Sequence, residues 1–144
     1  MMRVLRPVFI AGTLLMLSHG ALATDLNIQP GDWEFTNVTR ILGDSPFPEH
    51  TTTNRQCITA EDVAKGPQFM DLSEHCDMSN LQVTSGTMRY DMLCRENGME
   101  VQMTADMTFQ GDRLSGQVNA ELEGPMGRMP MQTDITARRV GDCP

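Results

Sequence analysis

The most reactive side chains in this 144-residue sequence belong to four cysteines, Cys57, Cys76, Cys94 and Cys143. They include no close Cys-x-x-Cys pair of the kind found in structural zinc sites, so disulfides are favoured over a zinc or copper site. An even number of cysteines is typical of disulfide-bonded exported proteins. Of the three pairings that four cysteines allow, we favour Cys57–Cys76 with Cys94–Cys143. The first would bracket a helical insertion, and the second would fasten the chain end to a central strand.

Methionine is the second unusual residue type, with 13 in the chain, whereas aromatic residues make up only 5%. Many methionines fall on positions that the expected strands turn inward. Thioether side chains are pliable, so the simplest interpretation is a core filled by methionine in place of rings. The same pliability would let the interior admit a small apolar or amphipathic ligand. The methionines that we predict to line such a cavity are Met88, Met92, Met103, Met107 and Met131.

Thioether sulfur also suits Cu(I), which gives methionine a third interpretation. Met126, Met129 and Met131 crowd one turn near the start of an expected strand. Against a copper site, Met99 and Met103 lie four strand residues apart, about 13 Å, so one strand cannot supply two ligands to one ion. Copper binding and the scavenging of oxidants by exposed methionines therefore remain alternatives to ligand binding.

The sequence contains no familiar catalytic motif. It has no Gly-x-Ser-x-Gly elbow, no His-Glu-x-x-His pair, no phosphate-binding glycine loop and no calcium loop. His75 precedes Cys76, but neighbours in an extended chain point to opposite sides, which disfavours a thiolate–imidazole pair. His50 lies beside a proline-containing loop, where an exposed structural role is the simpler interpretation. We therefore predict no enzyme activity, no cofactor and no metal site.

The elements that must position these side chains follow a period of two, which is typical of half-buried strands. Apolar and polar residues alternate over residues 99–109, 114–122 and 129–138, and shorter runs occupy 81–83 and 88–94. Closely spaced glycine-containing turns leave no room for crossover helices, so we predict an antiparallel meander from about 78 to 140. Residues 32–40 and 51–57 add two strands. Trp33, the only Trp, is predicted to anchor the core.

One short helix is predicted between the second and third strands. Thr59 is suited to cap a first turn that contains Glu61 and Asp62, Gly66-Pro67 would end it, and a second turn is expected at residues 69–72. So short a helix cannot cover the whole sheet. The predicted fold is therefore mainly β, a strongly curved antiparallel sheet or partly closed barrel of about seven strands, with the helical insertion plugging one end.

The first 23 residues resemble a cleavable secretory signal. Arg3 and Arg6 precede an apolar run at residues 8–17, and Ala21-Leu22-Ala23 supplies the small residues of a cleavage site. The run is about half the ~20 residues that a membrane-spanning helix needs, so no integral membrane span is predicted. We expect cleavage after Ala23, a single disulfide-bonded β domain of residues 24–144, and a periplasmic location.

The charge of the chain excludes one class of partner. The formal net charge is −8, and removing Arg3 and Arg6 with the signal would change it to −10. The only basic pair in the remaining chain is Arg138-Arg139. Because no basic cluster is present to neutralise phosphates, we predict no binding to nucleic acid.

Several short motifs, taken together, resemble a bacterial family. They are Gly31-Asp32-Trp33-Glu34, Gln56-Cys57-Ile58-Thr59 followed by Glu61-Asp62, a cysteine at Cys76, and the closing stretch from Arg138 to Pro144. Their order and spacing are similar to those of the domain of unknown function 3617 family. This resemblance implies a small exported protein of Gram-negative bacteria with paired cysteines, and it assigns no catalytic or binding residue.

The sequence therefore predicts an exported envelope protein without enzyme activity. The first hypothesis is a binding module for a small apolar or amphipathic ligand, which requires an enclosed cavity lined by methionine. The alternative is a module that binds an envelope protein, which would have a filled interior and an exposed apolar patch. Methionine-based buffering of copper or oxidants is the other alternative, and an enzyme is the least favoured class.

Overall fold

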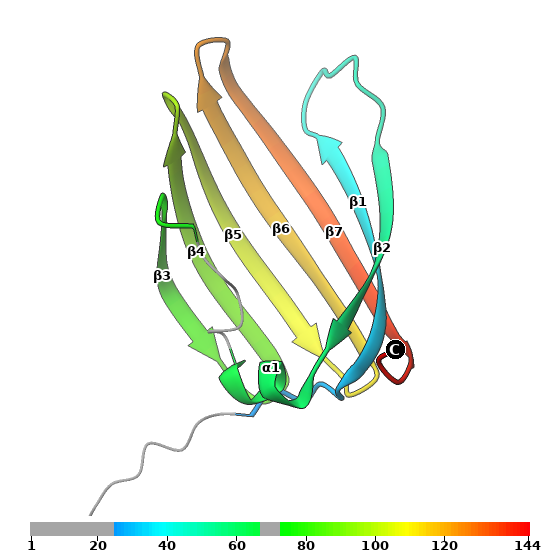
Figure 1. Cartoon of the computed structure of the whole chain (residues 1–144). Helices are drawn as coiled ribbons and strands as arrows, with labels where there is room; N and C mark the ends of the chain where they lie inside the picture. Colours follow the sequence, from blue (N-terminus) through cyan, green and yellow to red (C-terminus); the bar gives the residue numbers. More distant parts are fainter. Residues whose placement is uncertain (1–24, 67–72) are drawn as a thin grey trace, which may run out of the picture.

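Seven antiparallel strands form one open sheet in the computed structural model, which describes residues 25–66 and 73–144 (Figure 1). The strand order is β2-β1-β7-β6-β5-β4-β3, so the first strand pairs with the last and all other neighbours are hairpins. The sheet curls but does not close into a barrel. The strands are β1 (Gly31–Ile41), β2 (His50–Ile58), β3 (Cys76–Val83), β4 (Thr87–Glu96), β5 (Met99–Phe109), β6 (Arg113–Gly124) and β7 (Gly127–Gly141). The predicted mainly β fold is therefore confirmed.

The one helix in this part of the chain, α1 (Ala60–Lys65), follows β2 and begins at a capping box. The Thr59 hydroxyl accepts a hydrogen bond from the Asp62 amide at 3.1 Å, and the Asp62 carboxylate accepts one from the Thr59 amide at 2.9 Å. α1 lies across one end of the curled sheet, as the sequence predicts (Figure 1). The second predicted turn, at residues 69–72, and the predicted signal, residues 1–23, lie outside the described residues.

The two faces of the sheet differ in polarity because side chains alternate along each strand. The inner face carries Trp33 of β1, Met88 of β4 and Phe109 of β5, all of which are buried. Ion pairs between neighbouring strands lie on the opposite, outer face, for example Arg138–Glu34 at 2.8 Å and Arg89–Asp106 at 3.2 Å. The predicted sheet with one solvated face is thus confirmed.

The core is concentrated at the end of the sheet next to α1. Trp33 is fully buried there, and its indole Nε1 donates a hydrogen bond to the Gln29 carbonyl at 2.9 Å. Leu26 and Ile28 cover the same end, held by an isolated parallel bridge between Ile28 and Gly111. The prediction that Trp33 anchors the core is confirmed. The buried cluster comprises Leu26, Trp33, Ile58, Met88, Phe109, Leu114 and Ala137.

All four cysteines form disulfides, but the predicted pairing of Cys57 with Cys76 and of Cys94 with Cys143 is wrong. Cys76 lies directly opposite Cys94 in the β3–β4 register, and the two are bonded, with 4.0 Å between their Cα atoms. Cys57 is bonded to Cys143, with a Cα–Cα distance of 5.3 Å.

Strand register explains both bonds. Asp32 of β1 has Cys57 of β2 on one side and Gly141 of β7 on the other, so the chain end two residues beyond Gly141 reaches Cys57. Pairing therefore follows strand neighbours and not the span of the helical insertion.

Among the described residues, no helix has the length and apolarity to cross a membrane.

Candidate ligand-binding site

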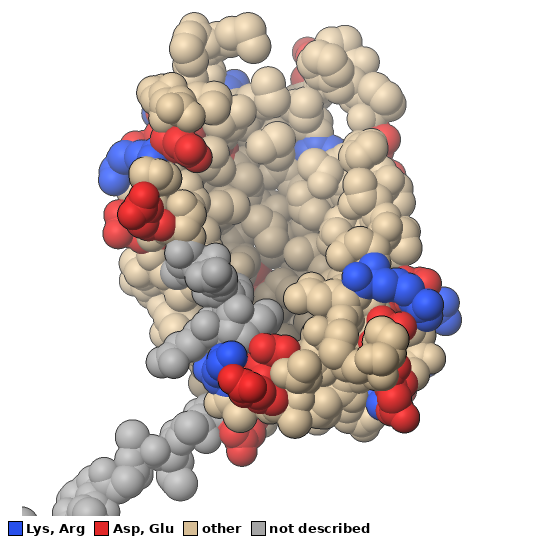
Figure 2. All heavy atoms as spheres, in the orientation of Figure 1, with Lys and Arg blue, Asp and Glu red and all other residues tan. Residues whose placement is uncertain are grey.

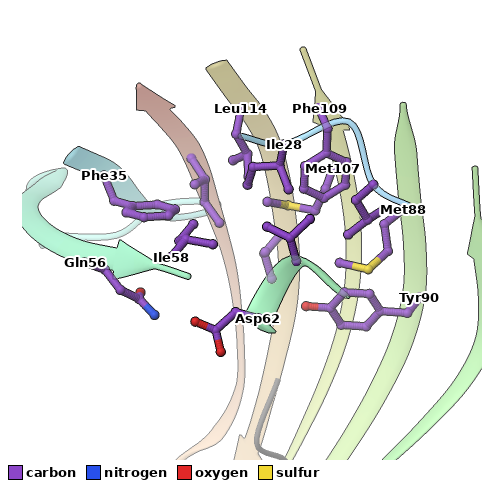
Figure 3. A pocket seen from close by; sticks show the side chains of 14 residues that line it. Ile28, Phe35, Gln56, Ile58, Asp62, Met88, Tyr90, Met107, Phe109 and Leu114 are labelled. Atoms are coloured by element: carbon purple, nitrogen blue, oxygen red, sulfur yellow. The ribbon is translucent and has the colours of Figure 1, made fainter. Parts of the chain in front are cut away.

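An apolar cavity of about 170 Å³ lies between the inner face of the sheet and α1 (Figure 3). Strands β1, β2, β4, β5, β6 and β7 contribute side chains to it, and α1 contributes Val63 and Asp62. A cavity of about 150 Å³ lined by Leu, Ile and Phe stays dry and binds benzene, so this space suits a ring or the end of a branched chain. Its apolar lining includes Phe35, Ile58, Met88, Met107, Phe109 and Ile135.

A second, more open depression of about 620 Å³ is lined by residues of alternating orientation on β4 to β7, including the carboxylates of Asp91 and Glu121 as well as Met92, Met103, Ala120 and Met131. The register pairs Met92 with Met103, Met103 with Ala120, and Ala120 with Met131. These residues follow the cavity residues on the same face, as Met92 follows Tyr90 two positions along β4. Figure 2 shows this side of the molecule hollowed, with most charged atoms at the rim of the hollow.

The five methionines predicted to line a cavity fall into two groups. Met88 and Met107 face each other in the β4–β5 register and both line the apolar cavity. Met92, Met103 and Met131 line the more open depression. The structure therefore places all five next to a cavity or depression, and contact with a ligand remains a prediction.

The residues of the copper alternative lie around the turn between β6 and β7. Met126 is 95% exposed there, whereas Met129 is half-buried and Met131 belongs to the open depression. In residues 25–66 and 73–144, no group of three or more His, Cys, Asp or Glu side chains is placed to hold a metal ion.

The polar groups of the apolar cavity are few. Gln56, Asp62 and Tyr90 line it, and the Tyr90 hydroxyl points inward (Figure 3). Burial raises the pKa of Tyr90 above its ordinary value of 10.0, so the hydroxyl stays protonated near neutral pH and can donate a hydrogen bond. The backbone and side chain of Thr59 hydrogen-bond to Asp62 and lower its pKa, which keeps this carboxylate charged and engaged in the helix cap.

The chemistry of the cavity is therefore apolar contact with a small number of hydrogen bonds. Among the described residues, its lining contains no cysteine, histidine or serine, and all four cysteines are oxidised. Sequence reasoning missed Tyr90, Gln56 and the segment with Leu26 and Ile28. Tyr90 has the same period-two signal as Met88 and Met92, but residues 26–28 precede the first strand and show no periodicity.

The comparisons place the chain in a family. The family model described as "Protein of unknown function (DUF3617)" matches residues 28–143. No curated protein and no solved structure matches the chain significantly. The match spans most of the sequence and includes the motifs at both ends of the sheet. The chain therefore belongs to the DUF3617 family.

Proposed function

We propose that this chain is an exported, non-enzymatic protein that binds a small apolar or amphipathic ligand between α1 and the inner face of its sheet. The observation that carries the proposal is the apolar cavity of about 170 Å³ beside the open depression. Binding sites for small molecules are concave, mostly apolar and supplied with a few placed polar groups. Tyr90, Gln56 and Asp62 are such groups.

Export is supported by the disulfides together with the signal-like residues 1–23. Disulfides form and persist in oxidising compartments such as the bacterial periplasm. Absence of an enzyme role is supported by the composition of the cavity lining, which offers no nucleophile with a neighbouring base. The role that fits these residues is holding a molecule and not transforming it.

The test is native mass spectrometry of the full chain expressed and isolated from the periplasm of a Gram-negative host. We expect the denatured, non-reduced mass to equal residues 24–144 less four hydrogens, and the native mass to include an added small molecule. A native mass without addition is then followed by titration with Nile red, an uncharged apolar dye. No addition and no dye binding together would reject the proposal.

A matched pair of variants locates the binding. Val118→Phe adds a ring to the cavity lining, whereas Val38→Phe makes the same change on the outer face of β1. We expect the first variant to lose Nile red binding and the second to retain it. Equal binding by both folded variants would place the dye elsewhere on the molecule.

One observation favours a second candidate, the module that binds an envelope protein. Leu42 and Phe47 in the loop between β1 and β2, and Met126 in the turn between β6 and β7, are exposed. This loop and this turn lie at the same end of the sheet, opposite α1 (Figure 1). The Leu42 amide donates a hydrogen bond to the Pro130 carbonyl at 2.9 Å, which ties the start of the first loop to β7. Phe47→Ser with Met126→Ser would abolish capture of a partner and leave Nile red binding unchanged.

A further inference from the structure

The inner face of the sheet divides into an apolar half and an uncharged polar half. Strands β4, β5 and β6 supply the apolar half, with Met88, Met92, Met103 and Met107 among its residues. Strands β1 and β2 supply the other half. This half includes His50, which pairs with Thr39, and four residues that we call the amide–hydroxyl wall: Asn37, Thr39, Thr52 and Asn54.

The orientation of the amide–hydroxyl wall follows from its neighbours. Phe35 of β1 and Gln56 of β2 line the apolar cavity, so residues two and four positions along each strand face the same side. The register joins the two strands there, pairing Asn37 with Thr52. The wall therefore continues the same face of β1 and β2 beyond Phe35 and Gln56, with Thr52 and Asn54 exposed.

Hydrogen bonding within the wall leaves polar groups available. Thr39 Oγ1 lies 2.9 Å from Thr133 Oγ1 of β7, so these two hydroxyls bond to each other. Thr133 is two positions from Ile135, which lines the apolar cavity. Within the described chain, the side-chain amides of Asn37 and Asn54 have no hydrogen-bond partner in the protein. Each amide offers two donors and an acceptor.

The inner face itself carries few charged groups, although Asp91 and Glu121 line the open depression from neighbouring positions. From the row of Phe35 to the row of Ile41, the inner-face positions of the seven strands carry no Lys, Arg, Asp or Glu in the described residues. In the part of the cavity lining that the structure describes, Asp62 of α1 is the charged residue, and its carboxylate already accepts hydrogen bonds from Thr59. A charged headgroup held between the two halves would lose water without gaining a free counter-charge, which is unfavourable.

We propose that the ligand is an uncharged amphipath, with an aliphatic body against the methionines and hydroxyl, ester or amide groups against the amide–hydroxyl wall. This inference rests on the proposed function and names its ligand class. From Phe109 to Met103, β5 spans six residue steps with four side chains on the inner face, roughly 20 Å at the rise of a strand. A medium-length acyl or alkyl chain fits that length, and a monoacylglycerol has both required parts.

The test compares three amphipaths that share one twelve-carbon alkyl length and differ in charge. Monolauroylglycerol is neutral, laurate is anionic and dodecyltrimethylammonium is cationic. Each displaces Nile red from the full, disulfide-bonded chain below its micellar concentration, at low and at high ionic strength. We expect the neutral compound to bind about tenfold more tightly than either ion, with an affinity independent of salt.

A second matched pair of variants tests the amide–hydroxyl wall. Asn37→Asp introduces a carboxylate of the same shape into the wall, and Asn97→Asp makes the same change in the exposed turn between β4 and β5. We expect the first variant to bind monolauroylglycerol about tenfold more weakly than the unmodified protein, and the second to bind it equally. Unchanged thermal unfolding of both variants would show that the effect is local.

The outcomes separate this inference from the proposed function. Equal or tighter binding of laurate or of the cation at high ionic strength would overturn the neutral ligand class and leave ligand binding intact. A neutral preference that Asn37→Asp does not weaken would overturn the role of the wall. If neither Nile red nor any amphipath binds, both the ligand class and the proposed function are rejected.

Discussion

Met107 of β5 and Gly116 of β6 are paired on adjacent strands, and the thioether of Met107 lies over the glycine. A Cβ added to Gly116 would lie 2.3 Å from Met107 Sδ and 2.9 Å from the Asp106 carbonyl oxygen. Met107 also lines the apolar cavity. The missing side chain at Gly116 therefore determines where this methionine lies and how much room the cavity keeps.

Gly116→Ala should displace Met107 into the cavity and strain the backbone of β5. We expect a loss of about 1–3 kcal/mol in the free energy of unfolding, the usual range for overpacking. We also expect weaker Nile red binding, because the displaced side chain occupies ligand space. Urea unfolding and dye titration measure the two effects on the same protein.

Two further variants show whether the effect comes from this pair. Gly124→Ala on the same strand places a Cβ at an ordinary 3.6 Å from Met99, so it should change neither measurement. Adding Met107→Ala to Gly116→Ala removes the thioether in question and should restore dye binding. If Gly116→Ala binds the dye normally, the position of Met107 does not control the cavity.

The two disulfides should stabilise the fold unequally. Cys57–Cys143 joins residues 86 apart in sequence and Cys76–Cys94 residues 18 apart. Loop-closure entropy then gives contributions to the free energy of unfolding of about 4.6 kcal/mol for the first bond and about 3.2 kcal/mol for the second. Replacing each pair by alanine and unfolding with urea should show the larger loss for the Cys57 and Cys143 variant. Peptide mapping without reduction checks the pairing, and any Cys57–Cys76 peptide would contradict it.

That pairing could have been predicted from the turn between β3 and β4. Cys76 and Cys94 are equally distant in sequence from Ser85, so a hairpin centred on the turn brings them opposite each other. The prediction of Cys57–Cys76 follows from the helical insertion that this bond would enclose, whereas the structure shows that strand register decides the pairing. The Cys57–Cys143 bond is harder to foresee, because it depends on β1 pairing with β7, a contact between distant parts of the chain.

The strands and the inward methionines were predictable for the same reason. A half-buried strand shows its buried face at every second position, so the positions of Met88, Met103 and Met107 were readable from local pattern alone. The residues at the closed end of the cavity were not predictable from the local pattern. A bridge to Gly111 holds Ile28, and the position of α1 follows from the chain that leaves β2. Neither placement has a periodic signature in the sequence.

Acid should destabilise the fold through carboxylates on the outer face. Hydrogen bonds from Arg138 lower the pKa of Glu34 below its ordinary 4.5, and hydrogen bonds from Asn80 and Thr104 lower that of Asp91 below 3.8. Because the folded values are depressed, their stabilisation is complete above the unfolded values and is lost as the pH falls through the folded values. The urea midpoint should stay level from about pH 7 to about pH 5 and then decline.

Removing the two carboxylates should flatten that decline. Glu34→Gln with Asp91→Asn leaves fewer groups whose proton uptake favours the unfolded chain, so the urea midpoint should vary less below about pH 5. Asp44→Asn, in the exposed loop after β1, serves as the control and should preserve the original slope. An equal slope in all three proteins would assign acid sensitivity to other groups.

Replacing Trp33 should show how much of the fold depends on the core beside the cavity. Trp33 is fully buried and donates a hydrogen bond to the Gln29 carbonyl. Trp33→Ala should therefore lower the free energy of unfolding by about 3–5 kcal/mol. Trp33→Phe loses the hydrogen bond and should lower the free energy of unfolding by about 1 kcal/mol or more. Phe47→Ala removes a ring that is 64% exposed and should be nearly neutral. Urea unfolding followed by circular dichroism compares all three, and similar losses for Trp33→Ala and Phe47→Ala would contradict the anchoring role of Trp33.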